Sequence, residues 1–251
     1  MHYDQWYDVI RLVLDMKQGR ITSDVPVIDD HGRTVGRYET LGLKHIGDSS
    51  LIEQLVRWRN QNVSGYLDQR RVTPEATAAW VVDAATNPTR IATLIYAGET
   101  LVGKCGIVQM TPGRVMSDGL VRGERGGGIK FMHFAQISRM IWDFYFFQLE
   151  EIHSKVLSTN DAAQESCRRL GYDMKPYRSQ ALYRKAYDEG VVLEEFGEPS
   201  ELLTDVKLDY YRLDREAFFR VVNANPAFAT MNAAIQDRFL SAGRSAVDHT
   251  G

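Results

Sequence analysis

The sequence has 251 residues, of which 44% are hydrophobic and 25% charged, the make-up of an ordinary globular protein. Its formal net charge of -3 argues against a nucleic-acid-binding protein that depends on bulk positive charge. Cys105 and Cys167 form no CxxC motif, so neither a disulfide framework nor a structural zinc site is indicated. The first residues do not read as a secretory signal, and no apolar run reaches membrane-spanning length. We therefore expect a soluble cytoplasmic protein that needs no metal and no membrane.

The N-terminal part of the chain predicts a helix and a hairpin, followed by a strand and two helices. Apolar residues recur at helical spacing through residues 3–18, and a turn at residues 29–32 separates short strands at 25–28 and 34–38. We expect residues 1–37 to form an appendage. We then expect a strand at 38–46. Two helices follow it, one from Asp48 to about Asn60 and one from Thr73 to just before Asn87, because Asp48 and Thr73 are N-cap residues.

Residues 91–121 predict an antiparallel meander of three strands. The segments 91–96 and 101–110 are rich in β-branched residues and are joined by a short turn, and a third strand at 114–121 follows a second turn. The helix after the meander, over about 128–149, places Phe134, Ile137, Ile141 and Phe144 on one stripe that further apolar residues widen. A stripe of this width predicts a largely buried helix.

The C-terminal part predicts strands and helices in alternation. We expect a strand at 151–158, a helix at 160–170 closed by Gly171, strands at 181–197 and 206–211, a helix from Asp214 to about Val222, and a second helix that ends near Leu240. From these elements we expect the chain to consist of four parts: an N-terminal appendage at 1–37, a main domain at 38–213, a helical extension at 214–240 and a disordered tail at 241–251.

Between the meander and the buried helix lies a basic, glycine-dense stretch, residues 121–132. Gly126, Gly127 and Gly128 let the backbone approach a ligand, and a helix that begins there directs free N–H groups at an anion. Arg122 and Arg125 add positive charge. The pattern predicts a phosphate-binding loop, although a glycine-rich surface turn with solvated arginines also fits the stretch by itself.

Taken in this order, the segments resemble the GCN5-related N-acetyltransferases (GNAT). Residues 125–128 resemble that family's Arg/Gln-x-x-Gly-x-Gly/Ala loop, with Lys130 in place of the last small residue. Residues 156–160 resemble its fifth strand, which ends in Asn, and residues 167–172 resemble its Tyr-x-x-x-Gly-Phe helix end. The helices at 55–60 and 72–80 are similar to those of members that modify amino sugars or peptide N-termini. The resemblance covers about residues 38–213.

The resemblance implies an α+β fold arranged as three layers. Its mixed, mostly antiparallel sheet splays between the fourth and fifth core strands, with helices on both faces and extra helices at both chain ends. It also implies acetyl-CoA as cofactor, with pantetheine between the splayed strands and the pyrophosphate on the glycine loop. The implied cofactor residues are Leu120, Val121, Arg122, Arg125, Gly126, Gly127, Gly128, Ile129 and Asn160. A Rossmann site or a P-loop does not fit, because the loop follows an antiparallel meander and lacks Gly-Lys-Ser/Thr.

Acetyl transfer to an amine needs a base, a stabilised oxyanion and a route for the leaving thiolate. Backbone N–H groups near Leu120 can serve the oxyanion. Asp118 and His153 are the candidate bases, although a strand-edge carboxylate and a hydrogen-bonded structural histidine are the plainer interpretations. Cys167 occupies the position where many GNAT members have a tyrosine acid, and a buried helix cysteine is the alternative.

Arg57, Arg59 and Asn60 are the candidate acceptor-binding residues, and a solvated helix end is the alternative. The resemblance favours a small amine acceptor, and the arginines suit a nucleotide-linked amino sugar. Acetylation of a protein N-terminus or lysine and a non-catalytic acyl-CoA-binding module remain open. The extra helices at the two chain ends predict a homodimer contact.

Overall fold

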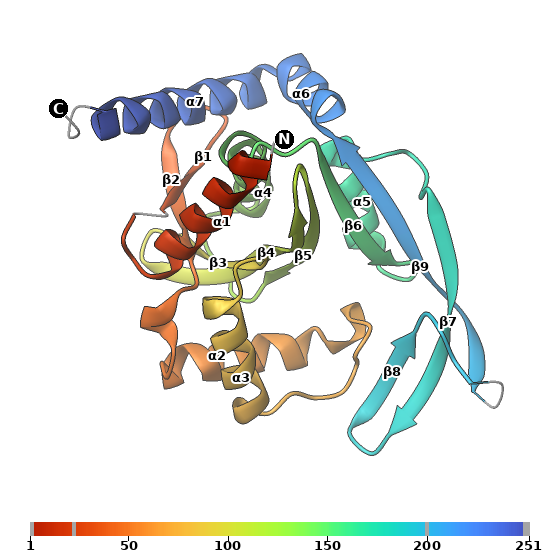
Figure 1. The fold of residues 1–251 in the computed structure, drawn as a ribbon. Coiled ribbons are helices and arrows are strands. Elements are labelled where there is room, and N and C mark those ends of the chain that lie inside the picture. Colours follow the sequence, from red (N-terminus) through yellow and green to blue (C-terminus); the bar gives the residue numbers. More distant parts are fainter. Residues whose placement is uncertain (1–2, 22–23, 199–200, 248–251) are drawn as a thin grey trace.

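The computed structural model describes residues 3–21, 24–198 and 201–247. In these residues nine strands form one sheet in the order β1-β2-β3-β4-β5-β6-β9-β7-β8 (Figure 1). The strands are β1 (Val25–Ile28), β2 (Thr34–Thr40), β3 (Ile91–Ala97), β4 (Thr100–Thr111), β5 (Arg114–Arg122), β6 (Glu151–Leu157), β7 (Arg178–Tyr187), β8 (Gly190–Glu194) and β9 (Leu202–Asp214). The helices are α1 (Tyr3–Lys17), η1 (Leu43–His45), α2 (Ser49–Gln61), η2 (Val63–Gly65), α3 (Pro74–Thr86), α4 (Phe131–Phe146), α5 (Asp161–Leu170), α6 (Arg215–Ala224) and α7 (Pro226–Val247).

One parallel pairing divides this otherwise antiparallel sheet. β5 and β6 pair in parallel over three residues only, and the last pair is Met116 with His153. Beyond that pair the two strands separate. The sheet is therefore splayed between the last strand of the meander and the next strand along the chain, which confirms the predicted fold class.

Helices cover both faces of the first half of the sheet. On β3, Leu94 belongs to a core cluster with α2 and α3, whereas Ile91 and Ile95 belong to the cluster that contains α4. Because successive strand residues point to opposite faces, the two helix groups lie on opposite sides of the sheet. α4 is buried over most of its length, as its wide apolar stripe predicted. Residues of α1, α6 and α7 join the α4 cluster, so both chain ends share its core.

The predicted capping residues act as caps. The side chains of Asp48, Thr73 and Asp214 accept hydrogen bonds from the backbone N–H three residues later, at 3.0, 3.2 and 2.7 Å. Asn160 does the same at the start of α5, at 3.1 Å, and Gly171 ends that helix with φ +88. These side chains satisfy N–H groups that a helix start leaves unpaired, so the local sequence determines where the helices begin.

At least four predicted element boundaries were wrong. The strand predicted at 38–46 does not extend that far, because β2 ends at Thr40. After it, the Nδ1 atom of His45 accepts a hydrogen bond from Gly42 N–H at 3.0 Å, and the chain turns into η1. The segment predicted as one strand at 181–197 is the β7–β8 hairpin, turned at Gly190 (φ +144). α4 begins at Phe131, because Gly127 and Gly128 have positive φ angles of 66 and 84.

The fourth boundary is the end of α7, which continues past the predicted position at Leu240 to Val247. The last four residues of the tail that was expected to be disordered, 248–251, lie outside the described residues. Of the helices that the structure describes, none combines the length and apolar character needed to span a bilayer.

Candidate active site

A β-bulge in β5 lies where the sheet opens. Lys104 pairs with Val121 and Gly106 pairs with Asp118, so three steps along β5 face two steps along β4. The extra residue falls at Gly119 and Leu120, both of which are exposed. A bulge removes backbone groups from the ladder and redirects them. Since β6 has already separated from β5 at this level, the bulge presents backbone groups to the space between the two strands.

That space is a cavity of about 970 Å³. Its walls come from β5, β6, the first turns of α4 and α5, and the chain after α2. Seven of the predicted site residues line it: Arg59, Asp118, Leu120, Val121, Arg122, Asn160 and Cys167. The lining does not include Arg57, Asn60, His153, Arg125, Gly126, Gly127, Gly128 or Ile129.

The glycine loop lies at the rim of the cavity, because Arg122 before it and Met132 after it both line the wall. Within the described structure, the backbone N–H groups of residues 125–130 have no hydrogen-bond acceptor. Gly127 and Gly128 have positive φ angles, and the stretch lies directly before the N-terminus of α4, where a helix favours negative charge. The loop therefore has several backbone N–H donors that form no bond within the described structure.

Two of the three consecutive glycines are also required by packing. A Cβ atom on Gly126 would lie 2.6 Å from Val102, and one on Gly127 would lie 2.3 Å from the ring of Phe131. At Gly128 no described atom lies within 4 Å of that position. Close approach of the loop to the protein core thus explains two of the glycines, and open space for a ligand remains at the third.

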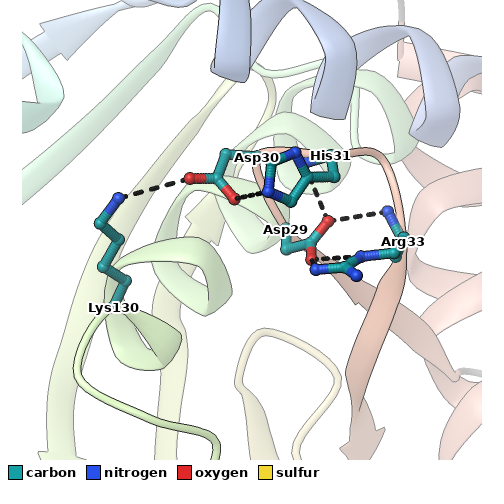
Figure 2. Close-up of polar contacts among 5 residues, drawn as sticks. All are labelled: Asp29, Asp30, His31, Arg33 and Lys130. Carbon is teal, nitrogen blue, oxygen red and sulfur yellow. Dashed lines mark hydrogen bonds and ion pairs between the residues drawn. The ribbon is translucent and has the colours of Figure 1, made fainter.

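The far end of the loop is tied to the N-terminal hairpin (Figure 2). Lys130 Nζ lies 3.4 Å from a carboxylate oxygen of Asp30, in the turn between β1 and β2. In the same turn, Asp29 accepts bonds from the backbone N–H groups of His31 and Arg33 and from the Arg33 guanidinium. Burial acts to raise the pKa of Asp29, but the Arg33 bonds lower it overall. The hairpin that the sequence suggested as an appendage thus helps to hold the start of α4.

Asp118 lies in the cavity wall together with Arg59 and Tyr66. The Arg59 guanidinium stacks 3.8 Å from the centre of the Tyr66 ring, and its Nη2 atom donates to the carbonyl of Asp68. Burial raises the pKa of Tyr66, Arg59 opposes this, and Asp118 adds to it. Among the described residues, Arg59 Nη1 and Tyr66 Oη are buried and have no hydrogen-bond partner. Buried donors without partners mark a place where a ligand can supply the missing bonds.

Cys167 is buried in the wall on the α5 side. Burial raises the pKa of its thiol to about 11, although a hydrogen bond with Ser154 acts in the opposite direction. The side chain is therefore a neutral thiol near pH 7. Its side-chain exposure is low, and Tyr172 beside it in the wall is also buried.

His153 lies outside the cavity, at the pair where β5 and β6 separate. Its Nε2 atom lies 3.0 Å from a Glu151 carboxylate oxygen, and its Nδ1 atom lies 3.1 Å from the Tyr177 hydroxyl. Both ring nitrogens therefore have partners, which agrees with the interpretation of His153 as a hydrogen-bonded structural histidine.

Arg57 and Asn60 are also engaged elsewhere. Arg57 forms an ion pair with Glu124 of the loop, which also accepts a bond from Trp58 Nε1 at 3.1 Å. The Trp58 bond and then the Arg57 bond lower the pKa of Glu124. Asn60 bonds to both backbone groups of Val72, at 2.9 and 3.1 Å. These two residues of α2 thus hold the glycine loop and the chain after α2, and of the three acceptor candidates only Arg59 reaches the cavity.

The sequence interpretation missed the cavity residues Tyr66, Asp68, Ser154 and Lys155. Tyr66 and Asp68 lie in a segment with neither helical nor strand periodicity, so no pattern indicated them. Ser154 and Lys155 lie in the middle of the predicted strand 151–158. The signal that was available for them was their place beside the expected splay.

Comparison with known proteins supports the same architecture. No family model matches the sequence, and no curated protein matches it. Solved structures match over most of the chain. One is the ribosomal L7/L12 alpha-N-protein acetyltransferase RimL in complex with coenzyme A, with a TM-score of 0.56 and 13% identity over 78% of this chain and 99% of that chain. The chain has the GNAT fold.

Two further structures show how widely this fold matches. A GNAT protein from Brucella melitensis gives a TM-score of 0.53 at 12% identity, covering 74% of this chain and 79% of that chain. The spermidine N-acetyltransferase from Vibrio cholerae, in complex with CoA and spermine, gives 0.55 at 8% identity, covering 74% and 98%. RimL and the spermidine N-acetyltransferase are named for different acceptors, so the shared GNAT fold does not identify the acceptor of this chain.

Proposed function

We propose that this protein is an N-acetyltransferase that transfers acetyl from acetyl-CoA to the primary amine of a small acceptor. The observation that carries the proposal is the bulge at Gly119 and Leu120, which opens into a cavity with Asp118 in its wall and, at its rim, a glycine loop whose N–H groups have no acceptor within the described residues. The solved RimL and spermidine acetyltransferase structures of the same fold hold CoA, which supports CoA as the ligand.

The residues fit this cofactor. The loop N–H groups of residues 125–130, with Arg122 and Arg125 beside them, would hold the pyrophosphate, and the cavity between β5 and β6 would hold the pantetheine arm. Bound acetyl-CoA supplies an activated acyl group. Backbone N–H groups at the bulge would stabilise the oxyanion that forms when an amine attacks.

Asp118 is the residue that we propose as the base. Its carboxylate is in the wall next to the bulge, and it can take the proton of the attacking amine directly or through one water molecule. Cys167 is a poor acid by comparison. Proton transfer from a thiol of pKa about 11 to a thiolate of ordinary pKa is uphill by roughly 3 kcal/mol. We therefore infer that the CoA thiolate leaves without a proton from Cys167.

The acceptor class that we propose is a nucleotide-linked amino sugar. Support comes from Arg59, whose free Nη1 donor suits the oxygen of a phosphate or sugar, with the Tyr66 hydroxyl beside it. An anionic, oxygen-rich acceptor would satisfy both buried groups while its amine approaches Asp118.

The experiment is an assay of acetyl-CoA consumption with UDP- and dTDP-linked amino sugars, spermidine and a peptide with a free N-terminus. We expect turnover with an amino sugar and a loss of about 10²–10⁴-fold in kcat for Asp118→Asn, the range for a lost general base. If only the peptide is acetylated, the proposed acceptor is wrong and the protein is a peptide N-terminal acetyltransferase. Binding of acetyl-CoA without turnover of any amine would instead indicate a non-catalytic acyl-CoA-binding module.

A further inference from the structure

Residues 66–72, here called the strap, connect the two halves of the splayed sheet. The strap leaves α2 and η2, which belong to the half made of β3, β4 and β5, and pairs with β8 of the other half (Figure 1). Gln69 N–H donates to the Val191 carbonyl at 2.7 Å, and Leu193 N–H donates to the Leu67 carbonyl at 2.8 Å. These two bonds flank the bridge between Asp68 and Val192.

Further contacts fix the strap at both ends. Arg71 N–H donates to the Glu189 carbonyl at 3.3 Å, and the Arg70 guanidinium lies 4.9 Å from the centre of the Tyr187 ring. A Cβ atom on Gly190 would lie 2.7 Å from the Gln69 carbonyl oxygen, so the strap packs directly on the turn of the hairpin. At its end the strap is held by the two bonds between Val72 and Asn60.

The consequence is a closed ring around the cavity. The ring runs from β5 through α2 and the strap to β8, β7, β9 and β6, and the last strand returns to β5 at the pair of Met116 and His153. Tyr66, Leu67 and Asp68 of the strap form part of the cavity wall. Without the strap, an acceptor could bind across the space between β5 and β6 from the side where α2 faces β8. Here the strap occupies that side.

We propose that the strap restricts the acceptor to a small amine that enters the cavity end-on, without the strap opening during turnover. This inference rests on the proposed acetyltransferase function. It adds that a lysine on the surface of a folded protein is excluded, because its neighbours would collide with the strap and the β7–β8 hairpin. It also excludes recognition by strand addition at β8, since the strap already occupies that edge.

A reversible disulfide across the bridge tests the inference. Directly opposed residues between the two flanking bonds have Cα atoms about 4.5 Å apart, which is within the range that a disulfide needs. The variant Asp68→Cys/Val192→Cys would be compared with itself, oxidised and reduced, and with each single variant as a control for the added thiol. The substrates are the amino sugars and spermidine, with a folded lysine-rich protein as the large acceptor, and acetyl-CoA consumption is followed by chromatography.

We expect kcat/KM for the small amine to agree within about threefold between the oxidised and reduced forms, and no acetylation of the large protein. A loss of tenfold or more on oxidation, restored by reduction, would show that the strap opens and would overturn the inference. Hydrogen exchange of the Gln69 and Leu193 amides gives a second readout that needs no acceptor. We expect slow exchange, and rapid exchange in the native protein would also overturn the inference.

The two proposals fail in different ways. If the native protein turns over no amine at all, the acetyltransferase function is wrong, while protected strap amides would still support a strap that stays paired with β8. If small amines turn over only in the reduced form of the double variant, the function stands and the end-on entry is wrong.

Discussion

Arg59 and Tyr66 form a stacked pair in the cavity wall, 3.8 Å from guanidinium to ring centre, and each side chain has a buried polar atom without a partner among the described residues. The two residues come from different segments, the last turn of α2 and the start of the strap. Their stacking orients both groups before any ligand is present. An acceptor that supplies oxygen atoms here gains hydrogen bonds at little cost in ordering.

The Tyr66→Phe variant tests this role. It removes an unpaired buried hydroxyl and keeps the ring under Arg59, so we expect a protein that is as stable as the native one or more stable, by up to about 1–3 kcal/mol. At the same time we expect KM for the acceptor to rise by roughly 2–13-fold, the loss of one neutral hydrogen bond, with the affinity for acetyl-CoA unchanged. Urea unfolding and steady-state kinetics measure the two effects. Lower stability with an unchanged KM would mean that the hydroxyl has a structural partner instead.

The Cys167→Ala variant separates an acid from a packing residue. Its thiol has a pKa of about 11 and is a weak proton donor. We therefore expect kcat to fall less than about fivefold, a much smaller loss than the removal of a general acid causes. The pH profile of kcat should keep its shape. A fall of a hundredfold, together with rescue by Cys167→Tyr but not by Cys167→Ser, would show that a proton donor is needed at this position.

The Gly123→Ala variant tests the packing of the loop against α2. A Cβ atom there would lie 1.8 Å from the indole ring of Trp58, which is buried and also bonds to Glu124. Overpacking of this kind costs about 1–3 kcal/mol of unfolding free energy. The matched control is Gly119→Ala, where no described atom lies within 4 Å and φ is not positive. Equal stability of the two variants in urea unfolding would contradict the packing argument.

Lys17 provides a pH-dependent test of how α1 is attached. Its Nζ atom donates to the carbonyls of Ala84 and Asn87 at the end of α3, at 2.5 and 2.6 Å. Burial lowers its pKa to about 8, although Asp83 acts in the opposite direction. In the folded state Lys17 therefore loses its proton at lower pH than in the unfolded chain, where its pKa is about 10.4.

It follows that the unfolded state binds more protons between these two values, so the Lys17 contribution to stability rises with pH from about 8 to about 10.4. We expect the difference in unfolding free energy between the native protein and Lys17→Met to change in favour of the native protein over this window. Urea unfolding at a series of pH values measures it. A difference that is constant from pH 7 to 10 would mean that Lys17 titrates at its ordinary pKa.

Local patterns in the sequence were sufficient for much of the fold. Asp48, Thr73 and Asp214 each cap a helix as predicted, because a cap depends only on residues within one turn. Asn160, which was predicted only as a cofactor contact, caps α5 as well. The meander, the glycine loop and the buried helix follow one another along the chain. The splay of the sheet was implied by the resemblance to the GNAT family, which this order of segments carries.

The rest of the site depends on contacts between distant residues. Asp68 meets Val192 across more than a hundred residues of chain, and nothing in residues 66–72 has the alternation of a strand. From the sequence, Asn60 is a polar residue at the end of a helix. In the structure its side-chain nitrogen and oxygen both form hydrogen bonds with the backbone of Val72. Gly126 and Gly127 read as ligand-binding glycines, although Val102 and Phe131 already require them to be small.

A crystal structure of the protein with acetyl-CoA tests the central claim most directly. We expect the pyrophosphate on the N–H groups of residues 125–130 and the pantetheine arm between β5 and β6. The thioester oxygen should lie about 2.7–3.1 Å from a backbone nitrogen at the bulge near Leu120, with the acetyl group facing Asp118. Acetyl-CoA bound elsewhere, or a thioester that points away from the bulge and from Asp118, would contradict the proposed function.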